Sequence, residues 1–168
     1  MCDEFTAQAE DQNLARRGIN RREFTALGAA GMALASCSGG VKADGGSDVT
    51  EKMVTITTAD GVCDACFVHP AKGAHPGVIM WPDIAGLRDA FKVMARSLAA
   101  EGYAVLVVNQ YYRSSPAPVM ESFSEFRTPE GREKIMPMRE LLDPEAITRD
   151  SKAFAAFLDQ QDQVDRLR

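Results

Sequence analysis

The stretch GVIMWPDIAGLRDAFKVMARSLAAEGYAVLVV, residues 77–108, decides the fold of this chain. It opens with the short apolar run 77–81 and closes with a second apolar run, 103–108, and both are typical of strands buried on both faces. Between them, residues 88–101 change to helical spacing, and Gly102 suits the end of a helix. A strand-helix-strand unit has a right-handed crossover and parallel strands, so we expect an α/β fold.

The predicted helix at 88–101 has two chemically distinct faces. We expect its apolar residues to pack on the sheet and its basic residues to face solvent. The two sets are Phe91, Met94, Ala95, Leu98 and Ala99 on the apolar side, and Arg88, Lys92 and Arg96 on the other.

An antiparallel hairpin is predicted before this unit. Residues 53–58 alternate and are β-branched, Asp60-Gly61 is a turn signal, and 62–68 form a second extended run. The chain after the unit is less regular, because four prolines interrupt 110–142, which we interpret as a loop with a short helical piece. Asp143-Pro144 then starts a helix that runs to about Gln160. Its predicted buried face consists of Ile147, Phe154, Phe157 and Leu158.

Composition excludes several classes of protein. The 168 residues are 45% apolar and 26% charged, with a formal net charge of -5, as in an ordinary soluble domain. A pI near 5.1 argues against a nucleic-acid partner. The sequence has no apolar run of the roughly 18 residues that a spanning helix needs. Four cysteines are too few and too scattered for a disulfide scaffold.

The N-terminal residues read as an export signal. Arg21-Arg22-Glu23-Phe24 fits the twin-arginine pattern ahead of a weakly apolar stretch, and Leu34-Ala35-Ser36-Cys37 is similar to a lipobox. We therefore divide the chain into a signal segment, 1–37, a flexible polar tether, 38–50, and a folded domain, 51–168.

Three consequences follow from this reading. The chain would engage the twin-arginine (Tat) export machinery and reach the periplasm or cell envelope. It would touch the membrane only through the signal segment or a lipid on Cys37, and plain cleavage nearby is the alternative to lipidation. The alternative to export is a helical N-terminal extension that merely contains basic residues.

Ligands of open α/β sheets bind beyond the carboxyl ends of the strands, where residues 81–87 and 109–113 lie here. Several phrases around them resemble the dienelactone hydrolase family over about residues 50–168. These are the Asp-Gly hairpin, Phe67-Val68-His69-Pro70-Ala71, Asp83-Ile84-Ala85-Gly86-Leu87, Ala99-Ala100-Glu101-Gly102-Tyr103 and Tyr111-Tyr112-Arg113. The resemblance implies part of the three-layer α/β-hydrolase sandwich and a cofactor-free hydrolase of small-molecule lactones or esters.

The resemblance also implies roles for four residues. Ile84 matches the backbone N–H donor of the oxyanion hole, and Asp83 matches an acid, usually glutamate, that contacts the nucleophile's thiol. Aspartate is one methylene shorter, and the alternative for Asp83 is a turn or N-cap acid. Arg113 matches an arginine that pairs with a substrate carboxylate, with Tyr111 beside it in the substrate site. The alternative for Arg113 is a surface arginine.

The family's cysteine nucleophile stands in a G-x-C-x-G turn, and no such turn follows a strand in this sequence. We expect it just beyond Arg168, with the acid and base of the triad later still, so residues 1–168 alone should be inactive. The alternative function is a non-catalytic cell-envelope lipoprotein that uses half a hydrolase fold as a binding module. Without the nucleophile's strand, the apolar strand 77–81 should be an open, aggregation-prone edge.

Cys63-Asp64-Ala65-Cys66, with His69 and His75 nearby, offers a metal or redox site as a third reading. Residues three apart on a strand point to opposite faces, which separates the two thiols. We therefore expect no metal site and interpret both cysteines as half-buried strand residues.

Overall fold

A computed structural model describes residues 48–166. The predicted signal segment with Cys37, and the tether up to residue 47, lie outside the described residues. The first strand, β1, spans Val49–Thr58 and so begins two residues before the predicted start of the folded domain at residue 51. Within the described part of the chain, no helix is long and apolar enough to cross a membrane.

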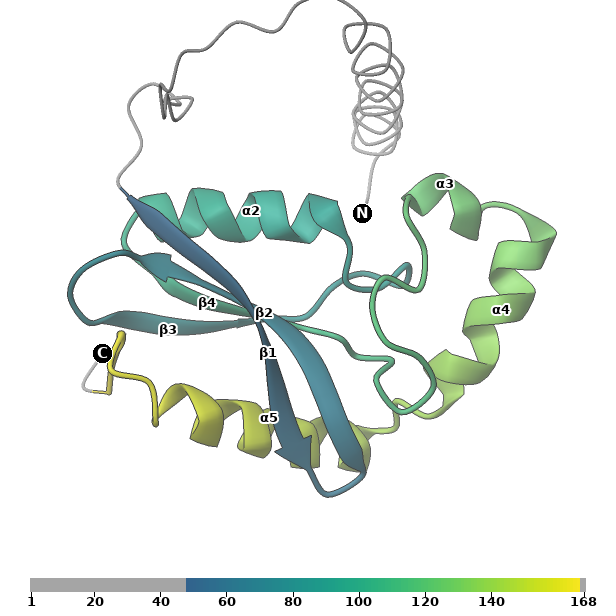
Figure 1. Cartoon of the computed structure of the whole chain (residues 1–168). Helices are drawn as coiled ribbons and strands as arrows, with labels where there is room; N and C mark the ends of the chain where they lie inside the picture. The colour runs from purple at the N-terminus through teal and green to yellow at the C-terminus, as the bar shows by residue number, and fades with distance from the viewer. Residues whose placement is uncertain (1–47, 167–168) are drawn as a thin grey trace, which may run out of the picture. The chain divides into compact units, whose positions relative to one another are not determined.

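The sheet has five strands in the order β1-β2-β4-β3-β5 (Figure 1). The predicted hairpin is confirmed, because β1 pairs antiparallel with β2, Gly61–Pro70, with Thr58 opposite Gly61. The predicted parallel pair of strands with a helix between them is confirmed as well, and the right hand of the crossover stays a prediction. Strand β3, His75–Met80, lies parallel to β4, Ala104–Val108, and helix α2, Asp89–Ala100, joins them.

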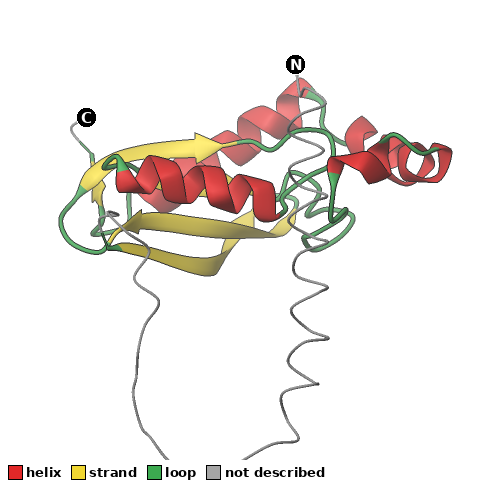
Figure 2. Ribbon diagram, turned by 90° about the horizontal axis from the view of Figure 1, so that it is seen from above, coloured by secondary structure: helices red, strands yellow, loops and turns green. Residues whose placement is uncertain are grey.

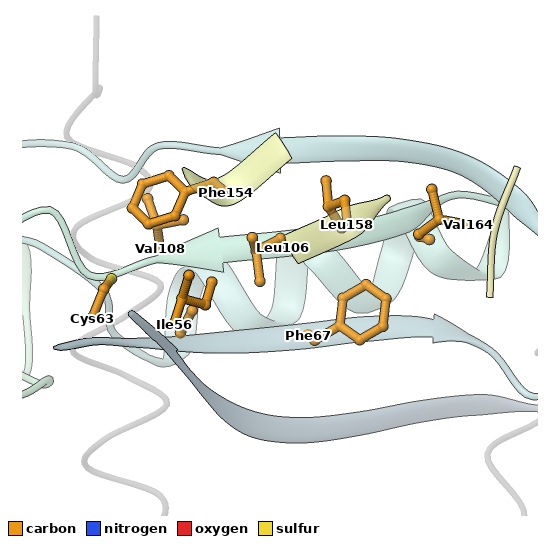
Figure 3. Packing of buried hydrophobic residues seen from close by; sticks show 10 residues of the cluster. Ile56, Cys63, Phe67, Leu106, Val108, Phe154, Leu158 and Val164 are labelled. Carbon is orange, nitrogen blue, oxygen red and sulfur yellow. The ribbon is translucent and has the colours of Figure 1, made fainter. Parts of the chain in front are cut away.

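Three layers form because alternate residues of β4 face different helices. Leu106 and its neighbours two residues away pack with Phe154 and Leu158 of α5, Pro144–Leu158, on one face (Figure 3). Val105 and Val107 pack on the opposite face with Ala95 and Ala99 of α2. Helices α2 and α5 accordingly lie on opposite sides of the sheet (Figure 1). The predicted three-layer α/β arrangement is confirmed.

Strand β3 differs from its predicted burial. All five residues of β4 are buried, whereas Val78, Ile79 and Met80 of β3 are only partly buried. The cause is β5, Val164–Asp165, which pairs in parallel with His75 and Pro76 alone. In the described residues, the rest of β3 has no neighbour on that side.

The prediction of a loop with one short helical piece over 110–142 is wrong. This segment contains two helices, α3, Phe123–Phe126, and the longer α4, Pro129–Glu140. Both lie beyond one end of the sheet (Figure 2). Thr128 caps α4 by accepting from the Gly131 N–H, and a proline follows at the first helical position. Pro137 lies inside α4 without ending it, and Ile135 on the same helix is fully buried.

Two buried-face residues were also predicted wrongly. Met94 of α2 is 51% exposed, and Ile147 of α5 is 40% exposed. On α5 the buried positions include Asp150, a charged residue.

Candidate active site: the β3 loop and its support

The loop that follows β3, residues 81–87 (the β3 loop), is held by the residues that follow β4. The Gln110 side-chain amide donates from Nε2 to the Asp83 carbonyl oxygen at 2.6 Å and to the Pro82 carbonyl oxygen at 3.2 Å. The Tyr111 hydroxyl donates to the Ile84 carbonyl oxygen at 2.9 Å. The structure therefore brings three of the four predicted site residues together, namely Asp83, Ile84 and Tyr111.

Asp83 is engaged within its own loop. Its Oδ1 accepts from the Ala85 N–H at 2.9 Å and from Arg88 Nη1 at 2.7 Å, and its Oδ2 accepts from Arg88 Nη2 at 3.1 Å. This is the turn-acid arrangement that the sequence offered as the alternative. Contact with a nucleophile's thiol stays a prediction for Asp83. The solvent-facing position predicted for Arg88 is wrong, since that residue is 3% exposed and paired with Asp83.

Ile84 presents a free backbone donor at the carboxyl end of β3. Among residues 48–166, nothing accepts a hydrogen bond from the Ile84 N–H, whereas the Ala85 N–H is taken by Asp83. Free backbone donors at this place are what an oxyanion hole requires. The assignment of the Ile84 N–H to that hole stays a prediction from the resemblance.

Tyr111 packs against the β3 loop and donates a hydrogen bond to it. It is 2% exposed, and burial raises the pKa of its hydroxyl, so the group stays protonated and donates. Gly86 has a positive φ of 82° and lies so close that an added Cβ would stand 3.3 Å from the Tyr111 ring. A role of Tyr111 toward substrate stays a prediction.

Arg113 lies in a different cluster. Its guanidinium donates to both oxygens of Asp150 on α5, at 2.8 and 2.9 Å, and to Asp60 of the hairpin turn at 2.6 and 3.1 Å. The side chain is only 12% exposed, so the surface-arginine alternative is wrong. Recognition of a substrate carboxylate stays a prediction.

Cys63 and Cys66 belong to separate clusters on opposite faces of the sheet. Both are fully buried rather than half-buried as predicted. Burial raises the pKa of Cys63 to about 12 and that of Cys66 to about 11, so neither is a thiolate at neutral pH. Across the described residues, no group of three or more His, Cys, Asp or Glu is placed to hold a metal ion.

Sequence reasoning missed three residues of these clusters. Gln110 and Asp150 were given no role, and Arg88 was expected to face solvent. Gln110 is the second residue after a fully buried strand, and a polar residue there that is 5% exposed must find partners. That position was the one available signal. Nothing in the helical pattern of α5 marked Asp150, because its partners come from distant parts of the chain.

Comparison with known proteins supports the resemblance. A model of the dienelactone hydrolase family matches residues 63–168. No curated protein matches the chain. Similar solved structures include a protein described as a dienelactone hydrolase from Klebsiella pneumoniae subsp. pneumoniae, with TM-score 0.57 and 18% identity. Two others are m3DLH, with TM-score 0.55 and 23% identity, and the dienelactone hydrolase-like promiscuous phosphotriesterase P91 from metagenomic libraries, with TM-score 0.51 and 28% identity.

In each of these three pairings the match covers 70% of this chain and 46% of the other. The chain thus spans about half the length of the solved structures that it resembles. The family model covers well over half of this chain, and it includes the β3 loop with Asp83 and Ile84. The chain belongs to the dienelactone hydrolase family.

Proposed function

We propose that this chain forms the oxyanion side of the active site in a hydrolase of lactones or carboxylic esters, with the nucleophile, acid and base encoded beyond residue 168. The observation that carries the proposal is the Ile84 N–H, which has no acceptor among residues 48–166 and belongs to a loop that Gln110 and Tyr111 hold by hydrogen bonds. Membership of the family and coverage of 46% of each solved relative support it.

The reaction would use the β3 loop as follows. The substrate carbonyl oxygen lies against the Ile84 N–H while a thiolate attacks the carbonyl carbon. Negative charge develops on that oxygen, and a preorganised donor stabilises it in the transition state. Collapse of the tetrahedral intermediate breaks the C–O bond, and the leaving alkoxide takes a proton from the protonated base of the triad. Water then cleaves the thioester bond, which releases the acid and restores the cysteine.

The test begins with the gene. We expect the nucleotide sequence after codon 168 to encode an apolar strand and then G-x-C-x-G, and the complete product to hydrolyse a p-nitrophenyl ester or a lactone. Ile84→Pro removes the donor N–H and should lower kcat by a factor of about 100 or more, whereas Ile84→Val keeps it and should not. A stop codon at position 169 would refute the enzymatic proposal and favour the binding module.

Export is proposed separately. Arg21-Arg22 and Cys37 support delivery to the cell envelope, with or without a lipid anchor. Lysine at both arginine positions should leave the protein in the cytoplasm. Cys37→Ser should shift it from the membrane fraction to the soluble envelope fraction if Cys37 is lipidated, and should change nothing if cleavage occurs elsewhere.

A further inference from the structure

We propose that Gln110 is a positioning residue that aims the Ile84 N–H at the reacting carbonyl oxygen by holding the peptide group to which that N–H belongs. The inference rests on the proposed hydrolase function. Gln110 touches neither the substrate nor the reacting atoms, and it acts through the backbone of the β3 loop.

The orientation of the Gln110 amide is determined by its surroundings. Nε2 faces two carbonyl oxygens, those of Pro82 and Asp83, and a reversed amide would place Oε1 against both of them. The side chain is 5% exposed, and within residues 48–166 its Oε1 has no hydrogen-bond partner. The amide is therefore oriented by its two donated bonds to the β3 loop.

These bonds, together with one that the Asp83 carbonyl oxygen accepts from the Gly86 N–H at 3.0 Å, hold the direction of the Ile84 N–H. The Asp83 carbonyl and the Ile84 N–H are the two ends of one planar peptide group, and in a trans peptide they point in opposite directions. The one cis peptide in the described residues is Ala117-Pro118, so this group is trans. With the Asp83 oxygen held on Gln110 at 2.6 Å, the Ile84 N–H points away from Gln110.

The next peptide group is held as well. Tyr111 donates to the Ile84 carbonyl oxygen, and Asp83 accepts from the Ala85 N–H at the other end of the same group. Two consecutive peptide groups are thus fixed by side chains, and the Ile84 N–H is the donor left over. A donor fixed before the reaction pays no reorganisation cost when the oxyanion forms.

The experiment compares an ester with its thiono analogue in the complete gene product. Sulfur accepts hydrogen bonds weakly, so a working oxyanion donor makes the enzyme prefer the oxygen ester. In Gln110→Met we expect kcat for the ester to fall about 10-fold or more with KM changed less than twofold, and the preference for oxygen over sulfur to shrink. Gln110→Asn keeps a donor but is one methylene shorter, so its kcat and its oxygen-to-sulfur preference should lie between those of the wild type and Gln110→Met.

Tyr112→Phe is the matched control, because it removes a partly buried hydroxyl two residues further along the chain, which bonds to Asp150 and Thr58 and not to the β3 loop. It should lower stability without changing the oxygen-to-sulfur preference. An unchanged preference in Gln110→Met, or in Gln110→Asn should the first variant not fold, overturns the inference.

If the wild type hydrolyses neither ester, the proposed function fails and a second measurement decides on Gln110. The ¹⁵N order parameter of the Ile84 amide should drop in Gln110→Met and not in Tyr112→Phe. Equal order parameters in wild type and Gln110→Met would refute the positioning role.

Discussion

Arg113 and Asp150 form a bidentate ion pair, with Nη1 donating to Oδ2 at 2.8 Å and Nη2 donating to Oδ1 at 2.9 Å. Asp150 lies on α5 and its side chain is 1% exposed, while Arg113 follows β4. The Tyr112 hydroxyl also donates to Asp150, at 2.8 Å. The pair therefore ties α5 to the end of the central strand, and its charges are shielded from water.

Asp150→Asn should destabilise the protein by about 3 kcal/mol, because it leaves the mostly buried Arg113 without its buried counter-charge. The matched control is Arg149→Ala, which breaks an ion pair to Asp60 in which the arginine side chain is 48% exposed. That change should cost less than about 1 kcal/mol. Urea unfolding of the two variants measures both values, and equal losses would contradict the buried-pair argument.

The sequence predicted the strands and helices of the central unit because their signals are local. Alternation marked the hairpin and helical spacing marked α2. Asp150 was missed because helical spacing ranks residues by hydrophobicity, and its burial depends on Arg113 and Tyr112, nearly forty residues earlier in the chain. Gln110 and Arg88 have the same explanation, since their partners are backbone and carboxylate oxygens of a loop whose shape the sequence pattern does not reveal.

Helix α4 was missed for a different reason. The prolines of 110–142 were read as interruptions, yet Thr128-Pro129 is the same cap-and-proline start that correctly predicted α5 at Asp143-Pro144. Pro137 lies near the end of α4, so only Met138, Arg139 and Glu140 follow it in the helix, and the missing N–H interrupts the helical bonding only there. The site role of Ile84 came only from the resemblance, because a backbone donor has no side-chain signature.

Acid should weaken the hairpin-turn cluster. Hydrogen bonds from Arg113, and then from Arg149, hold the pKa of Asp60 below its ordinary value of 3.8. The contribution of Asp60 to stability is therefore complete above about pH 4 and is lost as pH falls through its lowered folded-state pKa. We expect the difference in Tm between wild type and Asp60→Asn to be constant near neutral pH and to shrink below pH 4. A difference that stays constant down to about pH 2 would show that the carboxylate charge does not contribute.

The unpaired part of β3 should make a polypeptide of these 168 residues prone to self-association. Its residues Val78, Ile79 and Met80 are apolar and only partly buried, and beside them β5 covers only His75 and Pro76. The other edge, β1, carries Glu51 and Lys52 in a strand that is mostly exposed. We expect light scattering to rise on concentration, with amide hydrogen exchange slowing in β3 and not in β1. A soluble monomer with one sharp melting transition would contradict this prediction.

The two buried cysteines should make folding stability fall at alkaline pH, and their thiols should become reactive only when the protein unfolds. Burial raises the pKa of Cys63 to about 12 and that of Cys66 to about 11, from an ordinary value of 9.0. The folded state therefore binds more protons than the unfolded state above about pH 9, and folding stability should fall as pH rises from there to about 12. In a Cys2→Ser, Cys37→Ser background, which leaves only these two thiols, native protein at pH 8 should not react with a disulfide reagent, and unfolded protein should release two equivalents. Replacing both Cys63 and Cys66 by alanine should reduce the fall in Tm above about pH 9, because the part of that fall due to the thiols is removed. Rapid labelling of the native protein at pH 8 would show that the sheet opens around Cys63 or Cys66 far more often than their complete burial indicates.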